Sequence, residues 1–207
     1  VQLLRELAGP DDIRTARVEM RLVRLRLEQG QPEEALTLAR HTLAVHEMHY
    51  GPDHLETLRR HYNLGVVLEQ LDRLDEAEAS LRRALDGYVA RSGAEHVQTV
   101  YPRVMLADLM RRQRRYAEAL PLYADAIAAA RASVGAAHPV IGQSAMRLGD
   151  LLRRMRRYDE AAVALDEAEQ VLRPLGSPEL GQVLVFKGRL ALARGQAAQA
   201  IPQYEQA

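Results

Sequence analysis

The segment "LDEAEASLRRAL" (residues 74–85) returns in altered form along the whole chain. The copies are "PEEALTLARHTL" (32–43), "AEALPLYADAI" (117–127), "DEAAVALDEAE" (159–169) and "AQAIPQYEQA" (198–207). They bring five alanines into register, at intervals of 42, 42, 42 and 39 residues: Ala35, Ala77, Ala119, Ala161 and Ala200. A fixed period of this length indicates a repeat architecture, in which each unit is a small structural motif that packs on its neighbours.

Each unit contains two stretches with helical periodicity. In the second unit, residues 64–71 and 74–88 place apolar side chains three and four positions apart, as amphipathic helices do. Short polar turns separate the two stretches, and they are centred on Gly30, Asp72, Arg114, Arg156 and Gly195. Because a short connection suits antiparallel neighbours, the chain is predicted to be all-α and built from helix pairs.

Small residues recur at two further fixed positions. Seven residues after the alanines come Thr42, Ala84, Ala126, Ala168 and Ala207, and twelve residues before them come Val23, Gly65, Ala107, Gly149 and Gly188. Small side chains at a crossing point allow two helices to approach to about 8 Å. We therefore expect these residues to lie where the helices of a pair cross.

The connectors between units carry a second repeated pattern. Gly51, Gly93 and Gly135 follow the last periodic residue of a unit, where a left-handed conformation that suits glycine can end a helix. Three residues later stand His54, His96 and His138. Successive repeats are displaced by about 10 Å or more, whereas metal ligands lie about 2 Å from one ion, so these histidines cannot share a metal. They are predicted to cap the connectors or to bond between them.

Two local clusters suggest chemistry at first sight. In "RHTLAVHEMHY" (40–50), His41, His46 and His49 lack the spacing of a zinc-protease motif, and we expect a surface helix end at which histidines face the negative helix dipole. The arginine runs "RRQRR" (111–115) and "RRMRR" (153–157) form a ridge at successive turns. The preferred interpretation is solvated turns offset by Glu118, Asp159 and Glu160, and the alternatives are an acidic partner or nucleic acid.

Composition narrows the possible functions. The chain has 207 residues with 28 basic and 28 acidic side chains, no cysteine, no tryptophan and one phenylalanine. It has no apolar run long enough to span a membrane, and no phosphate-binding loop or recognisable catalytic constellation. We expect a cytoplasmic, non-enzymatic protein with no cofactor and no metal site, no membrane contact, and little basis for nucleic-acid binding.

The pattern resembles the tetratricopeptide repeat. The family's small and large positions are matched by Leu64, Gly65, Ala77, Leu81 and Ala84, then by Leu106, Ala107, Ala119, Tyr123 and Ala126, and again by Leu148, Gly149, Ala161, Leu165 and Ala168. The 42-residue period and the Gly-x-x-His connector are similar to the kinesin light chain variety, which is widespread in bacteria. The first and fifth units depart most, with Arg26 and Lys187 at positions that are usually apolar.

The resemblance covers essentially the whole chain and implies a fold. It is a right-handed α-α superhelix, or solenoid, of about five helix-pair repeats in a single domain (1–207). The repeats are expected at about 13–50, 55–92, 97–134, 139–175 and 179–207, with residues 1–8 as the end of a preceding helix. Both ends would cut a helix, so we expect either an excerpt of a longer protein or end-to-end self-association through uncapped termini.

The resemblance also implies a function, which is binding a protein or peptide in the groove lined by the first helix of each pair. The groove positions are Arg17, Met20, Arg21, Arg24, Arg59, Tyr62, Asn63, Val66, Tyr101, Met105, Asp108, Gln143, Arg147, Asp150, Gln182 and Arg189. Their arginines favour a ligand with acidic residues, and Asn63 stands where such repeats hold a ligand backbone. The alternative is a recruiting segment of a larger bacterial signalling protein, such as a serine/threonine kinase or a transcription regulator.

Overall fold

The computed structural model describes residues 2–207, with side chains from Arg5 onward, and Val1 lies outside this part. The described chain is all-α, as predicted, and it separates into two compact units that meet between Gly93 and Ala94. In the first unit the helices are α1 (Gln2–Ala8), α2 (Ile13–Glu28), α3 (Pro32–Tyr50), α4 (Leu55–Gln70) and α5 (Leu74–Ser92).

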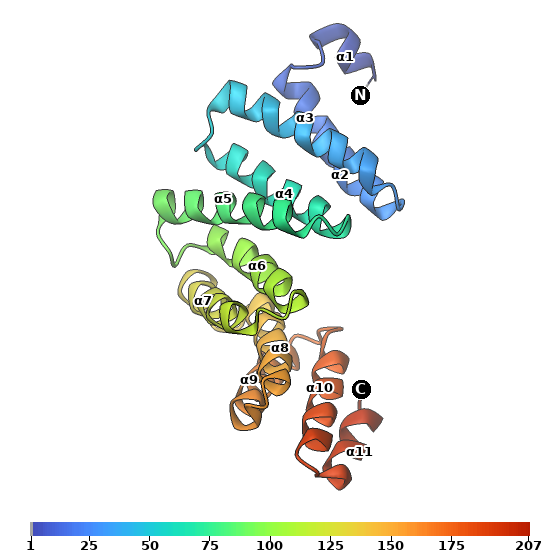
Figure 1. Cartoon of the computed structure of the whole chain (residues 1–207), viewed down its shortest axis with the longest axis vertical. Helices are drawn as coiled ribbons and strands as arrows, with labels where there is room; N and C mark the ends of the chain where they lie inside the picture. Colours follow the sequence, from blue (N-terminus) through green and yellow to red (C-terminus); the bar gives the residue numbers. More distant parts are fainter. Residues whose placement is uncertain (1) are drawn as a thin grey trace. The chain divides into compact units, whose positions relative to one another are not determined.

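The second unit continues the pattern. It comprises the 3₁₀ turn η1 (Val97–Thr99) and the helices α6 (Val100–Arg112), α7 (Tyr116–Val134), α8 (Pro139–Arg154), α9 (Tyr158–Leu172), α10 (Leu180–Ala193) and α11 (Ala197–Glu205). Within each unit every helix packs on the next one along the chain, from α1 to α5 and from α6 to α11. The helices of a pair run back along each other and are joined by tight turns (Figure 1). This arrangement confirms the predicted helix-pair repeat.

The tight turns within the pairs have one backbone geometry. Each is centred on a residue with positive φ, and at Asp72, Arg114 and Arg156 this residue is not glycine, with φ of 58°, 61° and 60°. At the third turn, Arg115 N donates to Met110 O at 2.8 Å and Arg114 N donates to Arg111 O at 3.1 Å. These two bonds form a Schellman motif, which satisfies carbonyl groups that the end of the helix leaves open.

The recurring small residues lie inside the helix pairs. Ala35, Ala77, Ala119 and Ala161 are fully buried, and Ala200 nearly so. At two of the positions twelve residues earlier, Gly65 and Gly149, a leucine side chain from the second helix occupies the space where a Cβ atom would stand. The predicted crossing points are therefore confirmed at these positions, where the absence of a side chain on one helix lets a large one on its partner pack against the backbone. Ala207 does not fit the prediction, because it is exposed and follows the end of α11.

The connectors between pairs use glycine and histidine for separate tasks. Gly51, Gly93 and Gly135 have φ of 86°, 88° and 84°, so the positive φ is confirmed. Their ψ values of 163°, 159° and 166° nevertheless lie far from the left-handed helical region that the sequence suggested. This extended region with positive φ is open essentially to glycine alone, because a Cβ atom would collide with the backbone.

The three connector histidines are helix caps. The Nδ1 atoms of His54, His96 and His138 accept hydrogen bonds from the backbone N–H two residues on, at 3.2, 3.3 and 3.3 Å. Asp12 does the same work at the start of α2 with its carboxylate, at 2.8 Å from Arg14 N. The capping role predicted for these histidines is confirmed, since each satisfies an open N–H at a helix start.

The second histidine cluster lies only partly at the surface that was predicted for it, since His49 is exposed and His41 is half-buried. His46 is fully buried, and His41 binds the fully buried carboxylate of Glu19 through Nδ1 at 2.7 Å. Arg5 of α1 donates to the same carboxylate at 2.8 Å. His49 lies against the backbone oxygen of Asp11 at 3.1 Å. His41 and His49 therefore tie α3 to α2 and to the segment before it, whereas His46 is buried because α4 packs against its side of α3.

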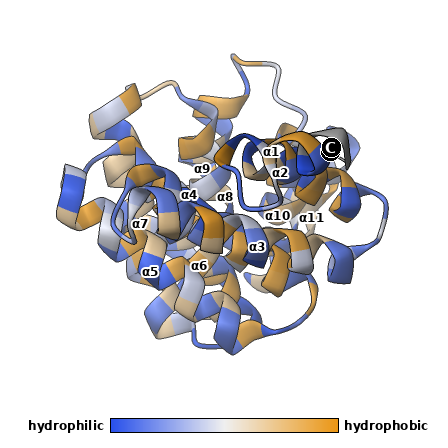
Figure 2. Ribbon diagram, turned by 90° about the horizontal axis from the view of Figure 1, so that it is seen from above, coloured by the Kyte–Doolittle hydropathy of each residue, from blue (hydrophilic) through white to orange (hydrophobic). Residues whose placement is uncertain are grey.

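The apolar residues are distributed as amphipathic helices require. Figure 2 shows hydrophobic and hydrophilic stretches alternating along the labelled helices. In the part of the chain that the structure describes, none of the helices combines the length and the apolar character needed to cross a bilayer.

Candidate partner-binding surface

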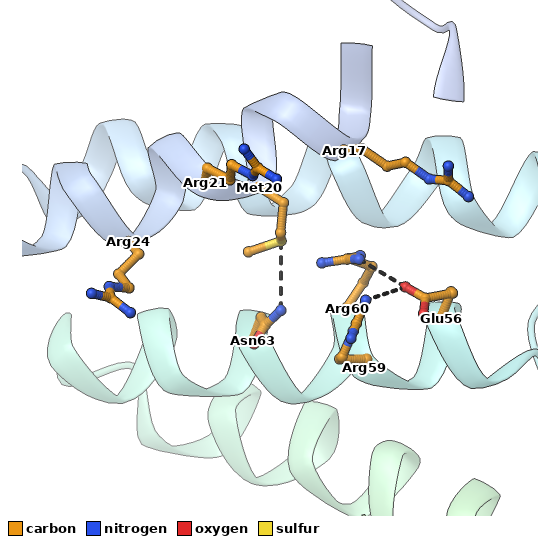
Figure 3. A pocket seen from close by; sticks show the side chains of 8 residues that line it. All are labelled: Arg17, Met20, Arg21, Arg24, Glu56, Arg59, Arg60 and Asn63. Carbon is orange, nitrogen blue, oxygen red and sulfur yellow. Dashed lines mark hydrogen bonds and ion pairs between the residues drawn. The ribbon is translucent and has the colours of Figure 1, made fainter. Parts of the chain in front are cut away.

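The first unit contains an open hollow of about 800 Å³ between α2 and α4. Six of its eight lining residues are predicted groove positions, and the other two are Glu56 and Arg60. The full lining is Arg17, Met20, Arg21, Arg24, Glu56, Arg59, Arg60 and Asn63 (Figure 3). The predicted Tyr62 and Val66 also lie on α4 and are half-buried, but they do not line this hollow. We call this set of eight residues the arginine hollow.

The arginine hollow is strongly cationic. Five arginines face one carboxylate, that of Glu56, and only Met20 contributes an apolar side chain. Arg24 forms an ion pair with Glu28 at 2.9 Å, and Arg17 donates to Tyr50 Oη at 2.9 Å. Arg21 is exposed and makes no hydrogen bond or ion pair with the residues that the structure describes. At least one guanidinium group is thus available to an anionic ligand.

Asn63 and Met20 form the middle of the hollow. Asn63 Nδ2 donates to Met20 Sδ at 3.5 Å (Figure 3). Thr42 Oγ1 donates to the same sulfur at 3.8 Å. A thioether is a weak acceptor, so the Asn63 amide gives up little when it turns to a ligand. Its carbonyl oxygen has no partner among the described residues, and the side chain can therefore offer both a donor and an acceptor to a peptide backbone.

Sequence reasoning missed two residues of the hollow, Glu56 and Arg60. Glu56 Oε2 accepts from Nη2 of both Arg59 and Arg60, and the Arg60 bond measures 3.0 Å. Burial raises the pKa of Glu56, but the two guanidinium groups outweigh it and leave the pKa below its usual value. The spacing of three and four residues could have revealed this contact, because Glu56 stands one helical turn before both arginines.

Arg60 is a buried cation. Its side chain is 5% exposed, and its Nε lies 3.3 Å from His46 Nε2. His46 Nδ1 lies 2.6 Å from Thr42 O and must donate there, so Nε2 is the acceptor for Arg60 and the imidazole is neutral. Burial lowers the pKa of His46, and the charge of Arg60 lowers it further. The buried histidine therefore fixes the direction of the Arg60 guanidinium.

In the second unit, half of the predicted groove residues bind neighbouring polar or charged side chains; they are Asp108, Gln143, Arg147 and Asp150. Asp108 accepts from Tyr123 Oη at 2.6 Å, from Arg111 at 3.2 Å, and from Arg147 of the next helix pair. Gln143 donates to Glu179 at 2.7 Å. These contacts tie α6 to α8, and α8 to the start of α10, so the side chains hold successive repeats together.

The remaining predicted positions of the second unit differ in exposure. Asp150 is 3% exposed and binds Arg153 and Arg154, each at 2.7 Å. Burial raises the pKa of Asp150, but the hydrogen bonds from Arg154 and Arg153 outweigh it and lower the pKa overall. By contrast, Tyr101 is 51% exposed, Met105 is half-buried, and Gln182 and Arg189 are exposed. The structure therefore brings six of the sixteen predicted groove residues together around one hollow, and it leaves the others outside it.

The arginine ridge of the second unit is largely neutralised. Arg115 pairs with Glu118 and Arg157 with Glu160, at 2.7 and 2.6 Å, as the sequence suggested. Arg111, Arg153 and Arg154 pair with aspartates of their own helices. Asp159, also expected to offset the ridge, binds Arg194, the residue that follows α10, instead. The interpretation of these runs as solvated, charge-paired turns agrees with these contacts.

Comparisons with known proteins agree with the repeat geometry. A family model described as tetratricopeptide repeat matches residues 14–90, 60–132 and 99–173. The chain is similar to the crystal structure of BtubC from P. vanneervenii, with a TM-score of 0.84, 17% identity, and coverage of 99% of this chain and 82% of that one. None of the curated proteins compared with the chain matches it in sequence.

Two further solved structures show the same fold. A putative kinesin light chain from Podosopora anserina has a TM-score of 0.81 and 20% identity, over 95% of this chain and 93% of that one. A Rap protein complexed with Competence and Sporulation Factor has a TM-score of 0.74 and 15% identity, over 91% of this chain and 51% of that one. At these identities the likeness concerns the fold alone, whereas the family model spans most of the helix pairs. Together with the buried alanines and the capped connectors, the match to this family model shows that the chain belongs to the tetratricopeptide repeat family.

Proposed function

We propose that this protein is a non-catalytic protein-interaction scaffold, and that its first unit binds an acidic segment of a protein partner in the arginine hollow. The observation that carries this proposal is Arg21, an exposed guanidinium beside four other arginines, without a partner among the described residues. A cluster of like charges costs free energy in the unbound protein, and an anionic ligand relieves it.

The shape and chemistry of the hollow favour a peptide over a compact small molecule. Arg17, Arg21 and Arg24 lie along two turns of α2, spanning about 10 Å at a rise of about 1.5 Å per residue. Carboxylates spaced along a chain can meet guanidinium groups arranged in this way, and Asn63 can bond the ligand backbone between them. The Rap protein, which shares the fold, was crystallised with Competence and Sporulation Factor, and this supports ligand binding as a use of such a scaffold.

The test is a binding titration with two labelled extended peptides, one rich in aspartate and one with asparagine in its place. The wild-type chain should bind the aspartate peptide, and the affinity should fall as salt rises, because the contacts are charged. Arg21→Glu should weaken binding by about ten-fold or more, as expected for loss of a charge-assisted contact. Asn63→Ala should weaken it as well.

A matched control is Arg82→Glu, which makes the same change of charge on α5, away from the lining of the hollow. It should leave the affinity within about two-fold, because a distant surface charge is screened. Equal binding of the two peptides, or equal effects of Arg21→Glu and Arg82→Glu, would rule out the hollow as the acidic-peptide site.

A further inference from the structure

Glu56 occupies one end of the arginine hollow in the way that a ligand carboxylate would (Figure 3). It lies at the start of α4, and one of its oxygens receives hydrogen bonds from both Arg59 and Arg60. Among the described residues, no other carboxylate lines the hollow. Arg59 and Arg60 are therefore already engaged by an anion that belongs to the protein itself.

The two partners of Glu56 differ in mobility. Arg60 is buried and held by His46, so its guanidinium stays in place whether or not Glu56 is present. Glu56 is 35% exposed, and Arg59 is 55% exposed. An exposed carboxylate can rotate into solvent at a small cost, whereas a buried guanidinium that lost its anion would have an uncompensated charge. A carboxylate that enters the hollow can therefore replace that of Glu56. One of these two carboxylates must remain beside Arg60, because its buried charge needs a partner.

From this arrangement, and on the basis of the proposed function, we propose that Glu56 is a specificity-determining residue that acts as an intramolecular competitor. A ligand with a single carboxylate gains little from Arg59 and Arg60, because it only takes the place of the tethered Glu56 carboxylate that already binds them. A ligand with two closely spaced carboxylates replaces Glu56 with the first and engages Arg21 with the second. Glu56 thereby selects partner segments that carry adjacent acidic residues.

The alternative is that Glu56 is only a stabilising ion pair within α4, as many pairs at this spacing are. The two roles differ in one measurable quantity, which is the ratio of affinities for ligands with two and with one carboxylate. A structural ion pair does not change this ratio, whereas a competitor lowers the affinity for the one-carboxylate ligand more than for the other.

The experiment compares Glu56→Gln with Glu34→Gln in the full chain. Glu34 pairs with Arg26 at 3.2 Å and neither residue lines the hollow, so this substitution removes the same charge without freeing an arginine of the hollow. The probes are two labelled glycine-serine peptides, one with a single aspartate and one with two adjacent aspartates. Thermal melts of both variants establish that they are folded.

We expect the wild-type chain to prefer the two-aspartate probe by about ten-fold, consistent with one additional charged contact. Glu56→Gln should strengthen binding of the one-aspartate probe by about ten-fold and reduce the preference to about three-fold or less. Glu34→Gln should change the two affinities equally and leave the preference unchanged. An unchanged preference in Glu56→Gln, or weaker binding of the one-aspartate probe, overturns the competitor role.

The outcomes separate this inference from the proposed function. If the wild-type chain binds neither probe, or if Arg21→Glu has no effect, the acidic-peptide site itself is wrong and the inference fails with it. If the wild-type chain binds and Arg21→Glu weakens binding, but Glu56→Gln keeps the wild-type preference, the site stands and only the role of Glu56 is wrong.

Discussion

Gly65 of α4 lies directly against Leu81 of α5, so closely that a Cβ atom on Gly65 would stand 2.6 Å from Leu81 Cγ and 3.3 Å from the backbone oxygen of Ala77. The same relationship holds between Gly149 and Leu165 in the second unit, also at 2.6 Å. The repeat thus sets the distance between its two helices by omitting a side chain where the leucine of the partner helix must fit.

Gly65→Ala should therefore destabilise the protein by about 1–2 kcal/mol in chemical denaturation. Overpacking costs about 1–3 kcal/mol, and the better helix propensity of alanine returns up to about 1 kcal/mol. In the background of Leu81→Ala the collision disappears, so Gly65→Ala should become neutral or stabilising. A double-mutant cycle without coupling between the two positions would contradict this account of the crossing.

Arg114→Gly should stabilise the protein. Arg114 has φ of 61°, a conformation that costs a residue with a Cβ about 1 kcal/mol or more, and glycine adopts it without strain. Glycine also gives the unfolded chain more conformational entropy, which offsets part of this benefit. The free energy of unfolding should therefore rise by about 0.5 kcal/mol. Arg156→Gly, with φ of 60°, should act in the same way.

The reverse substitution supplies the control for these turns. Gly30 occupies the equivalent turn of the first pair with φ of 70°, and Gly30→Arg should lower the free energy of unfolding by a similar amount. If all three substitutions changed the melting temperature in the same direction, backbone strain would not be the deciding effect.

Gly51→Ala should destabilise more than Gly30→Ala. Gly51 combines φ of 86° with ψ of 163°, in a region that essentially only glycine visits, at a cost on the order of 1–3 kcal/mol for other residues. Nothing lies within 4 Å of a Cβ atom at either glycine, so the comparison isolates backbone conformation from packing. Equal melting temperatures for the two variants would show that the conformation of Gly51 is no more demanding than that of Gly30.

Stability should fall as the pH drops below about 6.5. Burial lowers the pKa of both His46 and His61 in the folded protein, so below the usual value of 6.5 the unfolded chain binds protons that the folded chain does not. The free energy of unfolding is then highest above this pH, and it declines as the pH falls toward the folded pKa values.

His46→Gln should flatten this pH dependence. Glutamine can donate to Thr42 O and accept from Arg60, as the neutral imidazole does, but it does not titrate. The slope is measured by denaturation at a series of pH values between about 5 and 8, because this interval spans the usual pKa of histidine. A variant with the same slope as the wild-type chain would show that His46 does not carry the effect.

The sequence by itself determined the repeat, how closely its helices approach, and how they begin and end. The alanine and glycine positions, the turn centres at Asp72 and Arg114, and the capping role of His54 all follow from local rules. Residue size limits how closely two helices approach, and backbone geometry limits which residue can end a helix or cap one. Such rules act within a few residues or at one crossing, so a recurring pattern reveals them.

Only the tertiary structure decided which charges remain available to a ligand. The pairing of Asp108 with Arg147, the burial of Arg60 against His46, and the position of Glu56 in the hollow depend on side chains from different helices meeting in space. A repeat pattern averages over units and cannot show that one arginine is buried while Arg21 is exposed. The electrostatic free energy of a charge depends on its burial and on its nearest partner, and both are set by packing.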